Sequence, residues 1–195
     1  MRLSEMKTRD RIIIALGIIG IFFVFATIQI RNKQYQVEKA YAQAQQEVTS
    51  HDLQSILPYK NKYMGNAPNN INLFSHLPLS DYPRNYSQNP DTFTFEIHFE
   101  GTASGMGKNR LQKEILYSSV AGFALIDNLQ SLKYDFTDQC FTVRRKDIEK
   151  QYGDLKALLN ESSWHAMQEK LKKTGDVERI FTEVTLRQKK EGMSG

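Results

Sequence analysis

Residues 12–30 read IIIALGIIGIFFVFATIQI and carry no charged side chain, with Arg11 and Arg31 at the two ends. A helix of nineteen residues is about 28 Å long, close to the roughly 30 Å hydrocarbon core of a bilayer. Thirteen of the nineteen are Ile, Leu, Phe or Val, which favours insertion by roughly 4–8 kcal/mol. The stretch predicts a transmembrane helix, because a buried helix of a soluble core is rarely this long without a charge.

A cleaved signal peptide is the main alternative for this stretch. The apolar region of a signal peptide usually has about 7–15 residues and is followed by a small-x-small cleavage site. This run is longer, Thr27-Ile28-Gln29 fits such a site poorly, and Ala40-Tyr41-Ala42 lies well beyond the run. No cysteine directly follows the run, which excludes lipoprotein processing. We therefore predict an uncleaved signal anchor that contacts the lipid bilayer through residues 12–30.

Basic residues on the two sides of the run predict its orientation. Four of them precede the run and two follow it closely: Arg2, Lys7, Arg9 and Arg11, then Arg31 and Lys33. The positive-inside rule places the more basic side in the cytoplasm. We expect a single-pass protein of the cell membrane, with a cytoplasmic N-terminus and a C-terminal domain outside the cytoplasm.

The charge distribution argues against a nucleic-acid partner. Residues 1–31 contain five basic and two acidic side chains, whereas the other 164 of the 195 residues contain 21 basic and 20 acidic ones. A nucleic-acid-binding domain would need a clustered basic face. With Cys140 as its one cysteine and no histidine pair at helical spacing, the chain also predicts no disulfide, metal site or cofactor.

The apolar run divides the rest of the chain. We expect a cytoplasmic N-terminus over residues 1–11, a transmembrane helix over 12–30, a helical stalk over 31–50, an extracytoplasmic domain over 51–190 and a disordered tail over 191–195. Apolar residues at helical spacing from Val37 to Val48 predict the stalk. Its thin apolar stripe leaves two options open: packing on the domain, or pairing with a second stalk. The oligomeric state stays open for the same reason.

Local patterns predict the elements of the outer domain. A short helix capped at Thr49 or Ser50 should end before Pro58, and residues 58–92 read mostly as loop, with one or two helical turns over 70–77. Further along, we expect strands over 93–99, 132–136 and 140–143. We expect helices over 109–128 and 147–152, a third helix that begins at Ser162 or Ser163, and a last helix over 177–184. A strand over 180–186 is the alternative to the last helix.

The order of these elements, β-α-β-β-α-α, predicts the fold class. It is typical of an α+β domain, with a small antiparallel sheet and helices packed on one face. In the strand over 93–99, Phe93, Phe95, Ile97 and Phe99 alternate with polar residues, so we expect all four on the buried face and His98 on the opposite, solvent-facing one.

Several short segments resemble one bacterial family when they are taken in order. They are Leu57-Pro-Tyr-Lys60, Tyr63-Met-Gly-Asn66, Asn72-Leu-Phe74 followed by Leu77-Pro-Leu79, Phe123-Ala-Leu-Ile-Asp-Asn-Leu129, and Tyr152-Gly153 with Trp164 downstream. Over roughly residues 52–170 the chain resembles the bacterial domain-of-unknown-function 4825 family. The resemblance implies a membrane-tethered extracytoplasmic module of Gram-positive bacteria. In some relatives a similar domain is joined to a membrane metallopeptidase, but this chain lacks His-Glu-x-x-His.

We find no sequence pattern that predicts catalysis. Gly101–Asn109 has the context of a phosphate-binding loop, but Thr102 and Asn109 stand where that motif requires Gly and Ser or Thr. Cys140 lies in a hydrophobic hairpin, where a thiol is usually buried and inert. The resemblance supplies no catalytic residues either, so we expect a protein that is not an enzyme.

The loop rich in Asn and Tyr offers the best candidates for ligand binding. These are Tyr59, Tyr63, Asn66, Asn69 and Asn70, because aromatic rings with amide groups suit peptides, glycans or a partner protein. The alternative is that this loop wraps the core.

The sequence thus favours a non-enzymatic accessory or sensor-like domain that binds a ligand or a protein partner of the envelope or membrane. Two alternatives remain: a cell-envelope hydrolase or transferase with a site built from dispersed residues, and a structural protein that dimerises through its stalk. A pocket lined by convergent titratable groups would favour the enzyme, and an aromatic and amide groove would favour binding.

Overall fold

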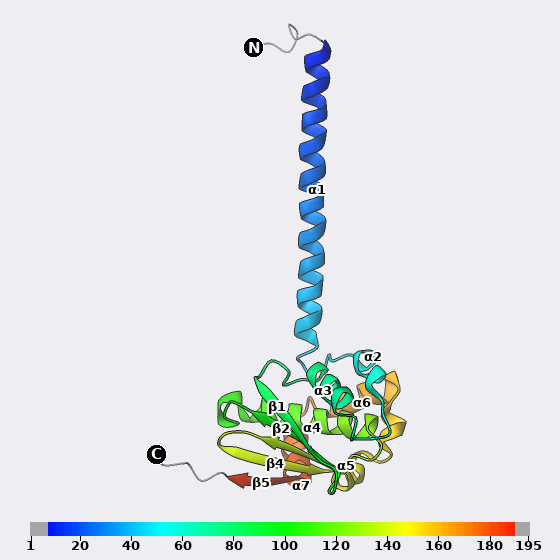
Figure 1. The fold of residues 1–195 in the computed structure, drawn as a ribbon, viewed down its shortest axis with the longest axis vertical. Coiled ribbons are helices and arrows are strands. Elements are labelled where there is room, and N and C mark those ends of the chain that lie inside the picture. Colours follow the sequence, from blue (N-terminus) through cyan, green and yellow to red (C-terminus); the bar gives the residue numbers. More distant parts are fainter. Residues whose placement is uncertain (1–7, 190–195) are drawn as a thin grey trace. The chain divides into compact units, whose positions relative to one another are not determined.

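The computed structural model describes residues 8–189 (Figure 1). The predicted disordered tail and most of the predicted cytoplasmic segment lie outside the described residues. The chain divides into two compact units between Gln43 and Ala44, and each is described by itself. The elements are α1 (Thr8–Ala44), α2 (Leu53–Ile56), η2 (Leu57–Tyr59), α3 (Ala67–His76), β1 (Arg84–Asn89), β2 (Thr94–Phe99), η3 (Ser104–Met106), α4 (Lys108–Leu125), β3 (Ser131–Asp135), β4 (Gln139–Arg144), α5 (Arg145–Tyr152), η4 (Leu155–Leu158), α6 (Glu161–Lys170), α7 (Thr174–Val184) and β5 (Thr185–Lys189).

The first unit is one continuous helix, α1, in which no residue is buried (Figure 1). It is the one helix of the described residues that is long and apolar enough to cross a membrane. The helix continues past the apolar run, as the sequence predicts, because residues 32–44 contain no helix breaker. It ends at Ala44, before the predicted stalk does, and turns follow up to Ser50.

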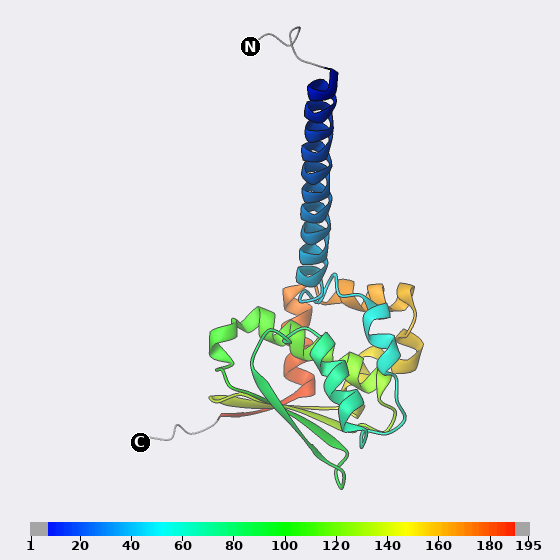
Figure 2. The same cartoon turned by 45° about the horizontal axis from the view of Figure 1, so that its top comes forward.

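The second unit is an α+β domain around a five-stranded sheet, which confirms the predicted class. The strands lie in sequence order from β1 to β5, and every neighbouring pair is antiparallel except β2 and β3. The prediction of a wholly antiparallel sheet is therefore wrong at this pair. Helix α4 connects β2 to β3, and a crossover of this length returns the chain in the parallel direction. Figure 2 shows the helices gathered over one face of the sheet.

Strand β1 was not expected from the sequence. It reads RNYSQN, and its alternating half-buried and exposed positions give no apolar signal. The predicted helix over 177–184 is confirmed as part of α7, whereas the alternative strand over 180–186 is wrong for 180–184, because strand β5 begins only at Thr185. The placement of Phe93 on the buried face is also wrong, because this residue has a φ of 49° in the β1–β2 turn and is 43% exposed.

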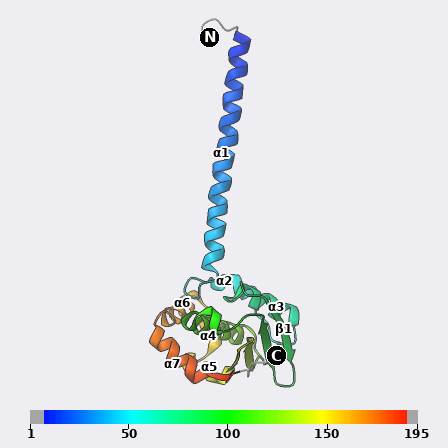
Figure 3. The same cartoon turned by 90° about the vertical axis from the view of Figure 1, so that its left-hand side faces the viewer.

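Helix α4 forms the centre of the domain, and 14 of its residues are buried. It packs between the sheet and the outer helices, with α6 and α7 on one side and α3 on the other (Figure 3). Gly122 permits the close approach of Phe74, whose ring stacks on Phe95 at 5.1 Å between centroids. A Cβ atom at Gly122 would lie 2.9 Å from the Phe74 ring.

Side-chain caps decide where the shorter helices begin. Asp52 caps α2 by accepting a hydrogen bond from the Gln54 amide, so the cap lies after the predicted Thr49 or Ser50. Asn160 caps α6, again not the predicted serine. In both cases the side-chain oxygen of a short Asp or Asn residue accepts a hydrogen bond from a backbone amide of the first turn, which has no partner within the helix.

Candidate ligand-binding site

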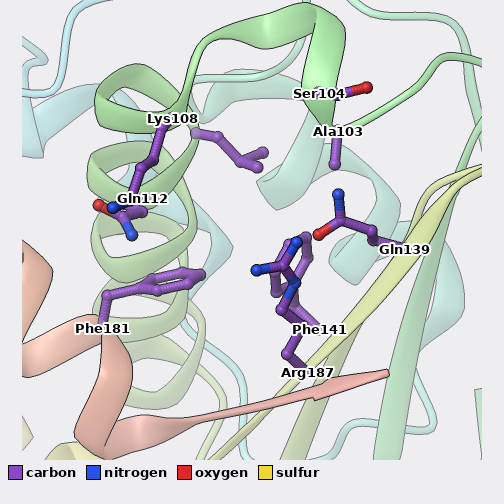
Figure 4. A pocket seen from close by; sticks show the side chains of 9 residues that line it. Ala103, Ser104, Lys108, Gln112, Gln139, Phe141, Phe181 and Arg187 are labelled. Carbon is purple, nitrogen blue, oxygen red and sulfur yellow. The ribbon is translucent and has the colours of Figure 1, made fainter. Parts of the chain in front are cut away.

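A cavity of about 250 Å³ opens between α4, the loop before it, β4, β5 and α7 (Figure 4). Its lining combines two basic residues, two amides, two aromatic rings and three smaller residues: Lys108 and Arg187, Gln112 and Gln139, Phe141 and Phe181, and Ala103, Ser104 and Leu111. None of these described lining residues is acidic or a histidine.

The loop that bounds one side of the cavity is held by Asp138 in the β3–β4 turn. Its carboxylate accepts hydrogen bonds from the Ala103 amide at 2.7 Å, the Ser104 hydroxyl at 2.9 Å and the Ser104 amide at 3.2 Å. Desolvation would raise the pKa of Asp138, but these hydrogen bonds outweigh it, so the pKa is lowered. The charged carboxylate therefore keeps the loop in place beside the cavity.

Helix α4 supplies one wall of the cavity. Gly107, with a φ of 79°, turns the chain into the helix, and Lys108 and Gln112 follow four residues apart on the same side. Gln112 is only 6% exposed, and its side-chain oxygen Oε1 is buried with no hydrogen-bond partner within residues 8–189. A buried polar group without a partner costs about 1–3 kcal/mol, so this oxygen is available to accept a hydrogen bond from a ligand.

Two phenylalanine rings form the apolar part of the cavity. Phe141 on β4 and Phe181 on α7 are buried, with their ring centroids 5.6 Å apart and the planes inclined by 62°. Edge-to-face rings of this kind leave a corner into which a third flat or branched apolar group can pack.

The basic residues of the cavity differ in their partners. Lys108 forms an ion pair with Glu178 of α7, and both side chains are more than half exposed. Arg187 pairs with Phe141 in the register of β4 and β5, and within the described part of the chain its guanidinium has no acidic partner. Figure 4 shows this guanidinium directed toward the space between Gln139 and Gln112.

The polar side chains of the lining offer hydrogen-bond donors and acceptors, with one hydroxyl among them. Ser104 carries the one hydroxyl among the described lining residues, and it donates to Asp138, with no histidine in the lining to act as a base. Nor do the described residues hold a group of three side chains that could bind a metal ion.

A second cavity, of about 290 Å³, is lined mainly by charged residues. The charged ones are Glu47, Arg110, Lys113 and Glu114, and the others are Val48, Thr49 and Asn109. Glu114 is 3% exposed, and Arg110 donates to it at 2.8 Å and to Asp81 at 3.1 Å. Burial raises the pKa of Glu114 to about 7 against the opposing effect of Arg110. The acidic and basic groups largely neutralise each other here, so this cavity offers a ligand less than the first one.

The predicted binding residues lie elsewhere, around α3 and the loop before it. Asn66 caps α3, Asn69 donates to the Tyr59 carbonyl at 2.7 Å, and Asn70 is fully buried and donates to the Met64 carbonyl. These amides hold the loop against the core. Of the five residues, Tyr63 and Asn66 are exposed, and the exposed fraction of Tyr63 is 67%.

The open face of the sheet carries a hydrogen-bonded chain that the sequence did not reveal. Ser87 Oγ lies 2.7 Å from His98 Nε2, and His98 Nδ1 lies 3.1 Å from Asp135 Oδ2. His98 is on the solvent side, as the alternation predicts. The three residues come from β1, β2 and β3, and no sequence spacing links them because the β1 strand itself was not recognised. Neither cavity is lined by this chain of residues.

The residues of the first cavity were also missed. Gln112 and Arg187 are ordinary polar residues in the sequence, and only the packing of α7 and β5 beside α4 brings them together. The one available signal was Gln112 itself, a polar residue next to Leu111 on the apolar side of a helix.

Comparison with known proteins identifies a family but no characterised relative. A family model described as Domain of unknown function (DUF4825) matches residues 56–149, from the end of α2 to the middle of α5. No curated protein and no solved structure matches the chain. The match covers β1 to β4 and α4, whereas α7 and β5, which complete the first cavity, lie beyond it. Over residues 56–149, slightly less than half of its length, the chain is similar to the DUF4825 family.

Proposed function

We propose that this chain is a membrane-anchored accessory or sensor-like protein whose α+β domain binds a small ligand in the cavity between α4, α7 and the sheet. The proposal includes a cytoplasmic N-terminus and a domain outside the cytoplasm, in the envelope of a Gram-positive bacterium. The apolar helix, the basic residues before it and the family resemblance support this arrangement.

The observation that carries the binding function is the buried, unpartnered side-chain oxygen of Gln112 in an aromatic cavity. A domain with no need to bind anything could place an apolar residue there and avoid the cost of an unsatisfied amide. Ligand pockets typically combine apolar walls with a few polar groups, which matches this lining.

A fragment screen by ligand-observed NMR on the full-length chain in lipid nanodiscs tests this function. The library should contain neutral, anionic and cationic fragments of about a dozen heavy atoms or fewer. Ala103→Leu adds three carbons at the cavity wall and should abolish the hits. Ala166→Leu makes the same change on the exposed side of α6 and should retain them. Hits that survive Ala103→Leu, or a complete lack of hits, would contradict the proposal.

A protein of the envelope or membrane is the expected partner that responds to the ligand. Cross-linking in intact membranes followed by affinity purification should recover one specific protein with the wild type. For orientation, a protease added to intact cells with an opened wall should degrade the domain, and protection of the domain would reverse the topology.

The Ser87–His98–Asp135 chain favours hydrolysis as a second candidate function. In such a reaction Ser87 Oγ would attack the carbonyl carbon of an ester or amide while its proton passes to His98 Nε2, with Asp135 orienting the imidazole. His98 would then give that proton to the departing alcohol or amine as its bond to the carbonyl carbon breaks, and water would hydrolyse the acyl-Ser87 ester to release the acid. A fluorophosphonate probe tests it directly. Labelling of the wild type and of Ser131→Ala, but not of Ser87→Ala, would support hydrolysis, and an unlabelled wild type would exclude a reactive Ser87.

A further inference from the structure

One basic residue of the cavity has no acidic partner within residues 8–189. It is Arg187, which is exposed on the edge strand β5. The other basic residue of the lining, Lys108, is paired with Glu178 of α7. Any anion that enters the cavity therefore meets a guanidinium whose donors are available.

The donor arrangement suits a carboxylate. A guanidinium presents parallel N–H groups that match the two oxygens of a carboxylate. The amides of Gln112 and Gln139 lie across the same space. Gln139 Nε2 donates to Asp138 at 3.4 Å, and each amide NH2 group has two N–H donors, so both side chains can donate to a carboxylate. A cationic ligand would find no acidic residue among the described lining residues.

The walls and the volume restrict the rest of the ligand. The corner between Phe141 and Phe181 accepts an aromatic ring or a branched aliphatic group. An apolar cavity of about 150 Å³ holds a benzene molecule. A volume of about 250 Å³ therefore holds one ring with a short acidic tail, but no nucleotide or oligosaccharide.

We propose that the cavity binds a small organic carboxylate, with its acidic group on Arg187 and its apolar body between Phe141 and Phe181. This inference rests on the proposed ligand-binding function and specifies the class of ligand. The same chemistry is available from a free small acid and from the C-terminal carboxylate of a peptide, and the experiment below separates them.

The test compares 4-(4-fluorophenyl)butyrate with its neutral amide by fluorine NMR on the full-length chain in nanodiscs. We expect the carboxylate to bind at least tenfold more tightly than the amide, because the charge-assisted hydrogen bonds to Arg187 are lost with the amide. Arg187→Gln should remove this preference and leave the affinity for the amide unchanged. Arg179→Gln, which removes an exposed arginine of α7 outside the cavity, should keep it.

A third probe separates the two sources of the carboxylate. An acetylated tripeptide ending in phenylalanine would bind at least tenfold more tightly than the fluorophenylbutyrate if the natural ligand is a peptide C-terminus. Equal or weaker binding of the tripeptide indicates a free small acid. Either result supports the carboxylate class, provided that Arg187→Gln weakens the probe that binds.

Three outcomes would overturn the carboxylate class. If the amide binds as tightly as the acid and Ala103→Leu abolishes both, the cavity is a ligand site but not one for anions, and the proposed function survives. If Arg187→Gln keeps the preference for the acid, the carboxylate is held elsewhere. If neither probe binds, the carboxylate class is wrong, and the neutral and cationic fragments of the screen then decide whether the cavity binds ligands at all.

Discussion

The two faces of the sheet use their side chains in different ways. On the face covered by helices, Phe95, Ile97 and Leu132 are buried in a continuous apolar core. On the open face the intervening residues form polar contacts across the strands, such as Glu96 with Lys133 and His98 with Asp135. The comparison indicates that the buried side chains of the covered face stabilise the domain, whereas the side chains of the open face contribute little to stability and can take part in binding or catalysis.

Substitution of a large residue on the covered face should have the largest effect. Phe95→Ala should lower the free energy of unfolding by about 3–5 kcal/mol, because it leaves a cavity beneath Phe74. Thr94→Ala, on the neighbouring open-face position, should change it by less than about 0.5 kcal/mol. Denaturant titration followed by the fluorescence of the single, buried Trp164 measures both. Equal effects would mean that the two faces contribute alike.

Overpacking between α4 and the sheet should have the next largest effect. Gly122→Ala would place a Cβ atom 2.9 Å from the Phe74 ring and 3.1 Å from Leu132, and should cost about 1–3 kcal/mol. Gly175→Ala in α7 meets no atom within 4 Å and should be neutral or stabilise the domain by up to about 1 kcal/mol. If Gly122→Ala proved neutral in the same titration, the close packing of α4 on the sheet would be in doubt.

Acidification should lower the free energy of unfolding through His51, a buried residue that is 3% exposed. Its Nε2 lies 2.6 Å from the His76 carbonyl and its Nδ1 2.8 Å from the Tyr117 hydroxyl, so the neutral ring is fully satisfied. Desolvation lowers the pKa of His51, although the His76 carbonyl and Asp52 oppose it, and the charge of a protonated His76 would add to it.

The sign of the effect follows from linkage. Because the unfolded chain binds a proton at His51 more readily than the folded one, stability is complete above about pH 6.5 and falls as the pH drops through that value. In the wild type, the denaturant concentration at the midpoint of unfolding should therefore be higher at pH 7.5 than at pH 5.5. The ratio of these two midpoints should move toward one in His51→Gln. It should stay as in the wild type in His165→Gln, because the His165 ring is exposed. An unchanged ratio in His51→Gln would assign the pH dependence to other groups.

The smallest effect is expected from an ion pair of the open face. Lys133 Nζ lies 3.1 Å from Glu96 Oε2, and both side chains are partly exposed. Glu96→Gln should cost about 0.2–1 kcal/mol, and the difference should shrink in 1 M salt because mobile ions screen the pair. A cost above that range that persists in salt would contradict the view of the open face as energetically minor.

Residues with a strong local pattern were predictable from the sequence. The uncharged run over 12–30, the alternation from Phe95 to Phe99 and the apolar spacing of α4 each report burial directly. Strand β1 was not predictable, because an edge strand of polar residues is stabilised by main-chain hydrogen bonds to β2. The parallel pairing of β2 and β3 was missed for a related reason, since strand direction depends on how α4 packs across the sheet.

The sequence by itself determined the long apolar helix, the α+β class and the family resemblance, because each depends on residue type and order along the chain. The tertiary structure alone decided which polar residues meet. Gln112 and Arg187 line one cavity only after α7 and β5 pack beside α4, and His98 lies between Ser87 and Asp135 only through strand register. The physical reason is that contacts across a sheet or between helices join residues far apart in sequence, and local spacing carries no record of them.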